Sequence, residues 1–241
     1  MVYFLHDYRK EFQLFMLTNL SIKKVSLATV LLYLLVFFSP YAFQPFSPNL
    51  VILGTTVTYI LGAAGMIWLY MKNKKSAATI TEREAKLTSP VFIFLLGISG
   101  IFLAMIIQAV VFSIETAITG EQPSSQNTQN IIAIILANPL FILATTIGGP
   151  IMEEFVFRRS MIGTIETYSG FWLAAVISSA LFSVIHQDGH FFVYFFMGLF
   201  FAILYKMTGK IWTSILAHCG MNTLVVIAQL ILHYANIELP Q

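Results

Sequence analysis

The chain has 241 residues, of which 58% are hydrophobic and 10% are charged, and its mean hydropathy is +0.81. Soluble domains contain about 25% charged and about 45–50% apolar residues, so this composition excludes a soluble globular domain and predicts a polytopic membrane protein. A net charge of +2, without a basic tract interleaved with aromatic residues, argues against binding to nucleic acid. The single cysteine, Cys219, excludes an internal disulfide and a cysteine-based zinc site.

The N-terminal residues 1–24 mix acidic and basic side chains and contain no small-residue cleavage site, so we expect a retained lead-in and not a removed signal peptide. A membrane-spanning helix needs about 20 apolar residues. The segments that approach this requirement are 25–43, 50–71, 91–114, about 133–167, 171–186, 190–205 and 211–233. The sequence therefore predicts an all-α bundle of about seven transmembrane helices, and Gly148-Gly149-Pro150 predicts a break within the fourth.

The polar connections predict how the chain is oriented in the membrane. Segment 72–86 contains five Lys or Arg residues, whereas segment 119–130 contains none. Cytoplasmic loops carry an excess of Lys and Arg. We therefore expect the N-terminus and segment 72–86 on the cytoplasmic side, and segment 119–130 and the C-terminus outside.

A few strongly polar residues fall inside the predicted spans: Glu153, Glu154, Arg158, Arg159, His186, His218 and Asn222. One charge at the membrane centre costs about 3 kcal/mol on insertion scales, so each charged residue needs a partner or a function. Glu154 and Arg158 are four residues apart, share one helix face and can neutralise each other. We expect Arg159 to extend toward the inner interface. Glu153 has no partner at helical spacing and is the functional candidate.

The spacing of the charged residues also predicts a meeting point across two helices. Glu153 lies 16 residues before Ser169, and His186 lies 17 residues after it. In an antiparallel hairpin that turns at 168–170, both side chains lie about 25 Å from the turn and can face each other. His218 and Asn222 are four residues apart, so they share one face of a third helix.

Ordinary packing explains some of these polar residues equally well. A lone histidine or asparagine in a membrane helix is often only a hydrogen-bonded helix contact. We expect Glu166 to be an interfacial surface charge and assign no role to His190. Asp188 is placed to contact either His186 or His190.

Three motifs in chain order carry a resemblance to a known family: Glu153-Glu154-x-x-x-Arg158, Phe182-x-x-x-His186 and His218-x-x-x-Asn222. They resemble the signature motifs of the CPBP (CAAX protease and bacteriocin-processing) intramembrane proteases, and in particular the small bacterial YdiL-like members. The resemblance covers roughly residues 130–236. It implies a protease core of four helices at 130–236, whereas the charge and hydropathy patterns predict a cytoplasmic lead-in at 1–24 and N-terminal transmembrane helices and loops at 25–129.

The resemblance implies a glutamate-dependent endopeptidase whose substrate is a peptide or a membrane protein within the lipid bilayer. Glu153 would be the general base that activates water, and His186 would share that water. His218 and Asn222 would stabilise the tetrahedral oxyanion. Structural roles, holding the helix and orienting Glu153, would fall to the remaining pair, Glu154 and Arg158.

A metal site is the open alternative for the same residues. Glu153, His186 and His218 are the three ligands that a zinc ion with an open fourth position would need. The sequence contains no His-Glu-x-x-His helix, however, and no acid that would support either histidine is evident. Catalysis without a cofactor is therefore favoured.

Two other classes of function compete with a protease. A non-catalytic bacteriocin-immunity or partner-binding membrane protein would keep the same fold without any need for an unpaired Glu153. A proton-coupled transporter would use Glu153 and His186 as a relay, but the sequence shows no inverted repeat.

Overall fold

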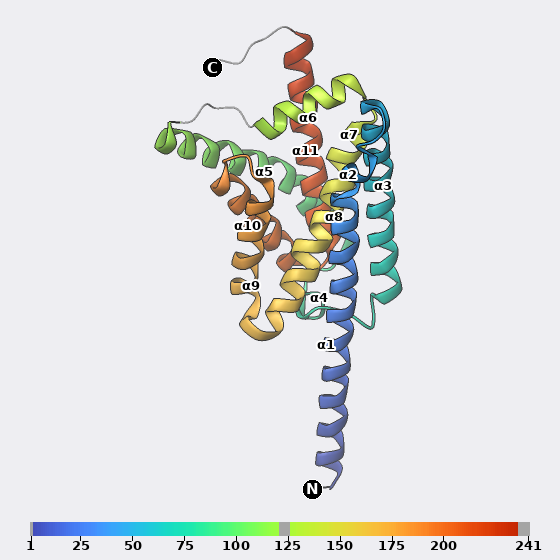
Figure 1. Ribbon diagram of the computed structural model, residues 1–241. Coiled ribbons are helices and arrows are strands. Elements are labelled where there is room, and N and C mark those ends of the chain that lie inside the picture. Colours follow the sequence, from blue (N-terminus) through green and yellow to red (C-terminus); the bar gives the residue numbers. More distant parts are fainter. Residues whose placement is uncertain (1, 121–125, 236–241) are drawn as a thin grey trace.

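The computed structural model describes residues 2–120 and 126–235, in which every regular element is helical (Figure 1). The α-helices are α1 (Val2–Phe37), α2 (Ser39–Phe43), α3 (Pro48–Asn73), α4 (Ile80–Glu84), α5 (Pro90–Thr119), α6 (Gln126–Ala137), α7 (Phe141–Leu143), α8 (Gly149–Glu153), α9 (Gly163–His186), α10 (Phe191–Thr208) and α11 (Ile211–Tyr234). Two π-helical segments, Ala144–Gly148 and Glu154–Ile162, flank α8. The predicted all-α class is confirmed. Three parts of the chain lie outside the described residues: residue 1, residues 121–125 of the predicted 119–130 connection, and residues 236–241. The C-terminal boundary of the predicted core falls in the last of these.

Six helical stretches among the described residues are long and apolar enough to cross a membrane. They are Met16–Phe43, Pro48–Asn73, Pro90–Thr119, Phe141–His186, Phe191–Thr208 and Ile211–Tyr234. The fourth has 46 residues and holds two of the predicted spans, because it bends at Gly170. Gly170 has φ 76° and ψ 169°, a conformation that glycine adopts readily and other residues rarely do. Figure 1 shows the chain reversing direction at this bend, so the protein is a multi-pass membrane bundle that contains a helical hairpin.

The predicted start of the hairpin at about residue 133 is wrong. Residues up to Ala137 belong to the separate short helix α6, and the chain turns at Asn138-Pro139 before α7 begins. Proline disfavours a helical conformation in the residue before it and cannot donate a backbone hydrogen bond. The Asn-Pro pair therefore ends α6.

The predicted break at Gly148-Gly149-Pro150 is also wrong, because the backbone remains helical through all three residues. Pro150 follows the π-helical turn Ala144–Gly148, in which the Gly149 N–H donates to the Ala144 carbonyl five residues back. The flanking π-helical turns absorb the change in hydrogen-bond pattern, and such turns often mark functional sites. A Cβ atom at Gly148 would lie 3.2 Å from the backbone of Tyr59, so the glycine lets α3 approach closely.

The two arms of the hairpin are joined near the residues of the predicted site. The Ser178 hydroxyl donates a hydrogen bond of 2.7 Å to the carbonyl of Phe157, and the rings of Phe157 and Phe182 meet edge to face at 5.2 Å. Phe157 lies four residues after Glu153, and Phe182 lies four residues before His186. The register of the hairpin therefore places Glu153 and His186 at similar depth, as their spacing predicted.

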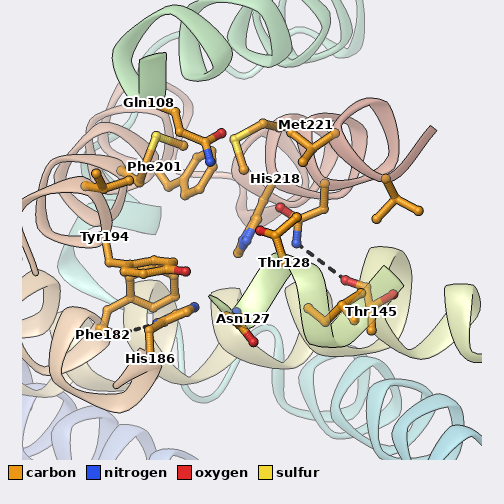
Figure 2. Close-up of a pocket in the computed structure, with 16 residues that line it drawn as sticks. Gln108, Asn127, Thr128, Thr145, Phe182, His186, Tyr194, Phe201, His218 and Met221 are labelled. Carbon is orange, nitrogen blue, oxygen red and sulfur yellow. Dashed lines mark hydrogen bonds between the residues drawn. The ribbon is translucent and has the colours of Figure 1, made fainter. Parts of the chain in front are cut away.

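A cavity of about 100 Å³ lies beside this hairpin, between α5, α6, α9, α10 and α11 (Figure 2). When volume is counted as the space open to the centre of a water molecule, as it is here, one water needs about 10–15 Å³. The helices thus leave room for several waters inside an otherwise apolar bundle.

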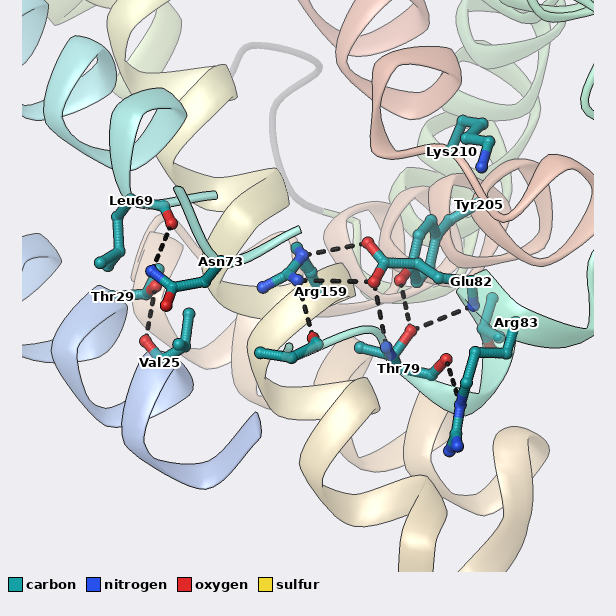
Figure 3. Close-up of polar contacts among 12 residues, drawn as sticks. Val25, Thr29, Leu69, Asn73, Thr79, Glu82, Arg83, Arg159, Tyr205 and Lys210 are labelled. Atoms are coloured by element: carbon teal, nitrogen blue, oxygen red, sulfur yellow. Dashed lines mark hydrogen bonds and ion pairs between the residues drawn. The ribbon is translucent and has the colours of Figure 1, made fainter. Parts of the chain in front are cut away.

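The predicted cytoplasmic connection 72–86 is folded against the hairpin. It contains α4, which begins with a capping box in which Thr79 and Glu82 bond each other's backbone N–H groups. Arg159 is 3% exposed, with its Nε atom 3.0 Å from Glu82 Oε1 and its Nη2 atom 2.9 Å from the Ala77 carbonyl oxygen (Figure 3). Arg159 thus reaches the connection that we expect at the inner interface, but it is buried there between Glu82 of α4 and the carbonyl of Ala77, which precedes α4.

Glu166 was expected to be a surface charge, and this is wrong. Its carboxylate is buried and accepts hydrogen bonds from the Thr81 backbone N–H at 3.1 Å and from the Thr81 hydroxyl at 2.7 Å. Two contacts far apart in sequence, Arg159–Glu82 and Glu166–Thr81, thus hold α4 against the first arm of the hairpin.

We expect Glu82→Gln to lower the free energy of unfolding by about 2 kcal/mol, because hydrogen bonds to a charged group are worth about that much and Arg159 would stay buried. Chemical unfolding of the detergent-solubilised protein measures this loss. Glu84→Gln is the matched control, since the Glu84 side chain is 66% exposed and lies 3.8 Å from Lys206. Equal losses in the two variants would contradict a specific role for the Glu82–Arg159 pair.

Candidate active site

The predicted site residues come from four elements of the C-terminal half. Glu153 ends α8, and Glu154 and Arg158 lie on the following π-helical segment. His186 is the last residue of α9. Two residues on one face of α11, His218 and Asn222, complete the set.

His218 is the residue on which the site converges. Its Nδ1 atom lies 2.9 Å from Glu154 Oε1, and its Nε2 atom lies 3.7 Å from Glu153 Oε2. Because a carboxylate only accepts, Nδ1–H donates to Glu154, and this bond fixes the plane of the ring. The imidazole also stacks on Phe201, with ring centroids 4.5 Å apart. Of two consecutive glutamates, one thus hydrogen-bonds to Nδ1 of the buried histidine and the other lies near Nε2.

Glu154 and Arg158 form the ion pair that their spacing predicted, at 3.4 Å between Nη1 and Oε1. Both side chains are fully buried, with 0% and 1% exposure. The guanidinium also lies 4.3 Å from the centre of the Phe182 ring and donates to the Gly198 carbonyl at 3.4 Å. Glu154 therefore has a cation on one side and a histidine that it orients on the other.

His186 is oriented by its own helix. Its Nδ1–H donates to the Phe182 carbonyl at 2.8 Å, which leaves Nε2 as a hydrogen-bond acceptor. The ring stacks on Tyr194 at 3.8 Å with an interplanar angle of 21°. His186 and Glu153 form no ion pair or hydrogen bond with each other among the described contacts.

His186, His218 and Asn222 all line the cavity, and Figure 2 labels the two histidines. Asn222 Nδ2 donates a long bond of 3.4 Å to the Thr145 carbonyl, and its second N–H is available to a ligand. Glu153 does not line this cavity; its side chain is 20% exposed and reaches the site at His218. The structure therefore unites Glu153, Glu154, Arg158 and His218 by direct contact, and His186 and Asn222 through the shared cavity.

The arrangement of these side chains does not favour the zinc alternative. Across residues 2–120 and 126–235, no three His, Cys, Asp or Glu side chains are grouped to hold one metal ion, so Glu153, His186 and His218 do not form a ready three-ligand site. The expectation that no acid supports either histidine is wrong for His218, which Glu154 holds, whereas a backbone carbonyl holds His186.

A second polar cluster lies next to the site, and the sequence indicated only its contact between Asp188 and His190. Glu115 Oε2 lies 3.1 Å from His190 Nδ1, and Glu115 Oε1 accepts from the Phe192 N–H at 3.0 Å. Asp188 accepts from the His190 N–H at 3.3 Å and from the Tyr194 hydroxyl at 2.6 Å. An acidic residue near the end of the apolar helix α5 could have marked Glu115 as a functional candidate. Nothing in the run 191–196, which is mostly aromatic, marks Tyr194 as the residue that stacks on His186.

Residues 134–224, which include all three motifs, match the family described as type II CAAX prenyl endopeptidase Rce1-like. The chain is 43% identical over 135 residues to YdiL of Bacillus subtilis (strain 168), a match that covers 56% of this chain and 55% of YdiL, about half of each. No solved structure matches the chain.

A longer match is to the membrane-embedded CAAX protease MroQ of Staphylococcus aureus (strain USA300). The two chains are 32% identical over 224 residues, and the match covers 86% of this chain and 89% of MroQ. Nearly the whole of a named protease is thus aligned with this chain, and the family match spans the residues that converge on His218. The chain belongs to the CPBP family of CAAX-protease-like membrane proteases.

Proposed function

We propose that this protein is an intramembrane endopeptidase that cleaves peptide bonds with a water molecule activated by Glu153, without a metal. The observation that carries the proposal is the placement of His218, whose two nitrogens face Glu153 and Glu154 and whose ring lines a cavity shared with His186 and Asn222. The cavity has room for water, which amide hydrolysis consumes.

Glu153 is the general base in this mechanism. Its carboxylate takes a proton from water while the water oxygen bonds to the carbonyl carbon of the substrate, and the carbonyl oxygen becomes an oxyanion. When the C–N bond breaks, the same proton passes from Glu153 to the leaving nitrogen. A positioned base contributes about 10²–10⁴-fold to such a reaction. The free Nε2 atom of His186 accepts a hydrogen bond from the water and orients it.

His218 and Asn222 stabilise the oxyanion. With a proton on both nitrogens, His218 donates Nδ1–H to Glu154 and Nε2–H to the oxyanion, and Asn222 donates its side-chain N–H. One such donor is worth about 10²–10³-fold in kcat in other hydrolases. Glu154 and Arg158 act through position, since Glu154 holds the imidazole and Arg158 balances the charge of Glu154.

The charge of the connections supports an orientation with the N-terminus in the cytoplasm and the C-terminus outside. The first residues of α1 and the last residues of α11 lie at opposite ends of the bundle, which fits an odd number of crossings (Figure 1). Substrates are peptides or membrane-protein segments that enter the cavity from within the bilayer.

The test is cleavage of a quenched-fluorescent peptide library, which includes peptides with a prenylated C-terminal cysteine, by the detergent-purified protein. We expect the wild type to cleave with or without a strong chelator, and His186→Ala and His218→Ala to lose about 100-fold or more in kcat/KM. Loss of activity with chelator and its recovery with zinc would contradict the metal-free mechanism. No cleavage by the wild type would contradict a protease and favour a partner-binding membrane protein.

A further inference from the structure

The wall of the cavity formed by α5 contains a polar side chain that the proposed mechanism does not use. Gln108 is the one carboxamide in α5, a strongly apolar helix that is long enough to cross a membrane. Figure 2 shows its amide entering the cavity near Phe201 and Met221. Nothing in the three motifs accounts for an amide at this depth.

Gln108 has no such partner as Ser99, Ser113 and Glu115 of the same helix have. Ser99 and Ser113 donate to carbonyls of their own helix at 2.6 Å and 2.8 Å, and Glu115 is held by His190. The Gln108 carboxamide forms no hydrogen bond with any of the residues that the structure describes. A polar group without a partner is costly in a membrane interior, so its donors and acceptor are available to whatever occupies the cavity.

The position of Gln108 relates it to the catalytic residues. Gly220, between His218 and Asn222, lies directly against Ile101 of α5, with no room for a Cβ atom. Gln108 is seven residues beyond Ile101, which is about 10 Å along the helix. An extended peptide covers that distance with about three residues. A substrate whose scissile bond lies at His218 and Asn222 therefore reaches Gln108 with its main chain.

We propose that Gln108 binds the backbone of the substrate, pairing its carboxamide with one peptide group about three residues from the scissile bond; this inference rests on the proposed endopeptidase function. A carboxamide has both a donor and an acceptor, so it can hydrogen-bond to the C=O and N–H groups of an extended chain whatever the side chains of that chain are. Figure 2 places the apolar side chains of Phe201 and Met221 beside it, and the same cavity is also lined by Val193, Met197 and Val225 and by the polar Asn127 and Thr128. The substrate is thus an extended segment with an apolar side chain within about three residues of the cut.

The probe for the first test is the library peptide that the wild type cleaves fastest. We expect Gln108→Leu to lower kcat/KM about tenfold, the effect of losing one hydrogen bond, without lowering the melting temperature. Ser99→Ala, which removes a polar group from the outward face of the same helix, is the control and is expected to leave kcat/KM unchanged. An unchanged kcat/KM in Gln108→Leu, or a fall matched by a lower melting temperature, would overturn the inference.

The second test separates binding of the backbone from a general effect on packing. Each N–H of the probe peptide outside the scissile bond is replaced in turn by an ester oxygen. We expect the wild type to lose about tenfold at one position, and Gln108→Leu to lose nothing further there. Equal losses in both proteins at every position would overturn the inference while leaving the protease intact. Absence of cleavage by the wild type would instead contradict the proposed function on which the inference rests.

Discussion

Glu153→Gln is expected to lower kcat for peptide cleavage about 1,000-fold while the protein stays folded and inserted in the membrane. Glutamine has almost the same shape as glutamate, but its amide cannot take a proton from water. The side chain is 20% exposed, and the contact at risk is the one to His218 at 3.7 Å. The loss is therefore expected in kcat, with little change in the melting temperature.

The matched control is Glu84→Gln, which removes a carboxylate from an exposed position on α4. Both variants and the wild type are assayed with the same fluorescent peptide, and their melting temperatures are measured in the same detergent. Full cleavage by Glu153→Gln would contradict its role as the base. A loss of cleavage accompanied by a large fall in melting temperature would assign Glu153 to structure instead.

The fold was predictable from the sequence because membrane helices follow local rules. Apolar length defined the spans, and helical spacing defined the Glu154–Arg158 pair. The shared depth of Glu153 and His186 followed from counting residues on either side of a turn near Gly170. Each of these features depends on residues that lie close in sequence or on one short hairpin.

The polar partners that were missed lie far away in sequence. Glu154 binds His218 across 64 residues, Arg159 binds Glu82 across 77, and Glu166 binds Thr81 across 85. No spacing rule connects such pairs, so Arg159 and Glu166 were assigned to the membrane surface. Helix packing, which the sequence pattern alone does not define, brings these partners together.

The predicted helix break at Gly148-Gly149-Pro150 was wrong for a different reason. The rule that proline ends a helix assumes that a regular α-helical bond is lost. Here π-helical segments on both sides of α8 change the bonding pattern, and the chain continues. As a result, the predicted opening of the helix does not occur, and the cavity forms between helices instead.

The largest expected effect on stability comes from Arg158→Met. Removing this cation leaves Glu154 buried without its ion-pair partner, and breaking a buried pair in this way costs about 3–5 kcal/mol. Unfolding in a denaturing detergent measures the loss. Arg158→Lys is expected to recover only part of it, because an ammonium group does not match both the Gly198 carbonyl and the face of the Phe182 ring.

The double variant Glu154→Gln/Arg158→Met separates charge balance from catalysis. With both charges removed, most of the lost stability is expected to return, since buried pairs replaced by neutral groups are often near neutral in stability. Cleavage is expected to stay low, because Glu154 also fixes the His218 ring through Nδ1. A double variant as unstable as Arg158→Met would show that the guanidinium contributes mainly by packing on Phe182. A stable double variant with full activity would remove Glu154 from the orientation of His218.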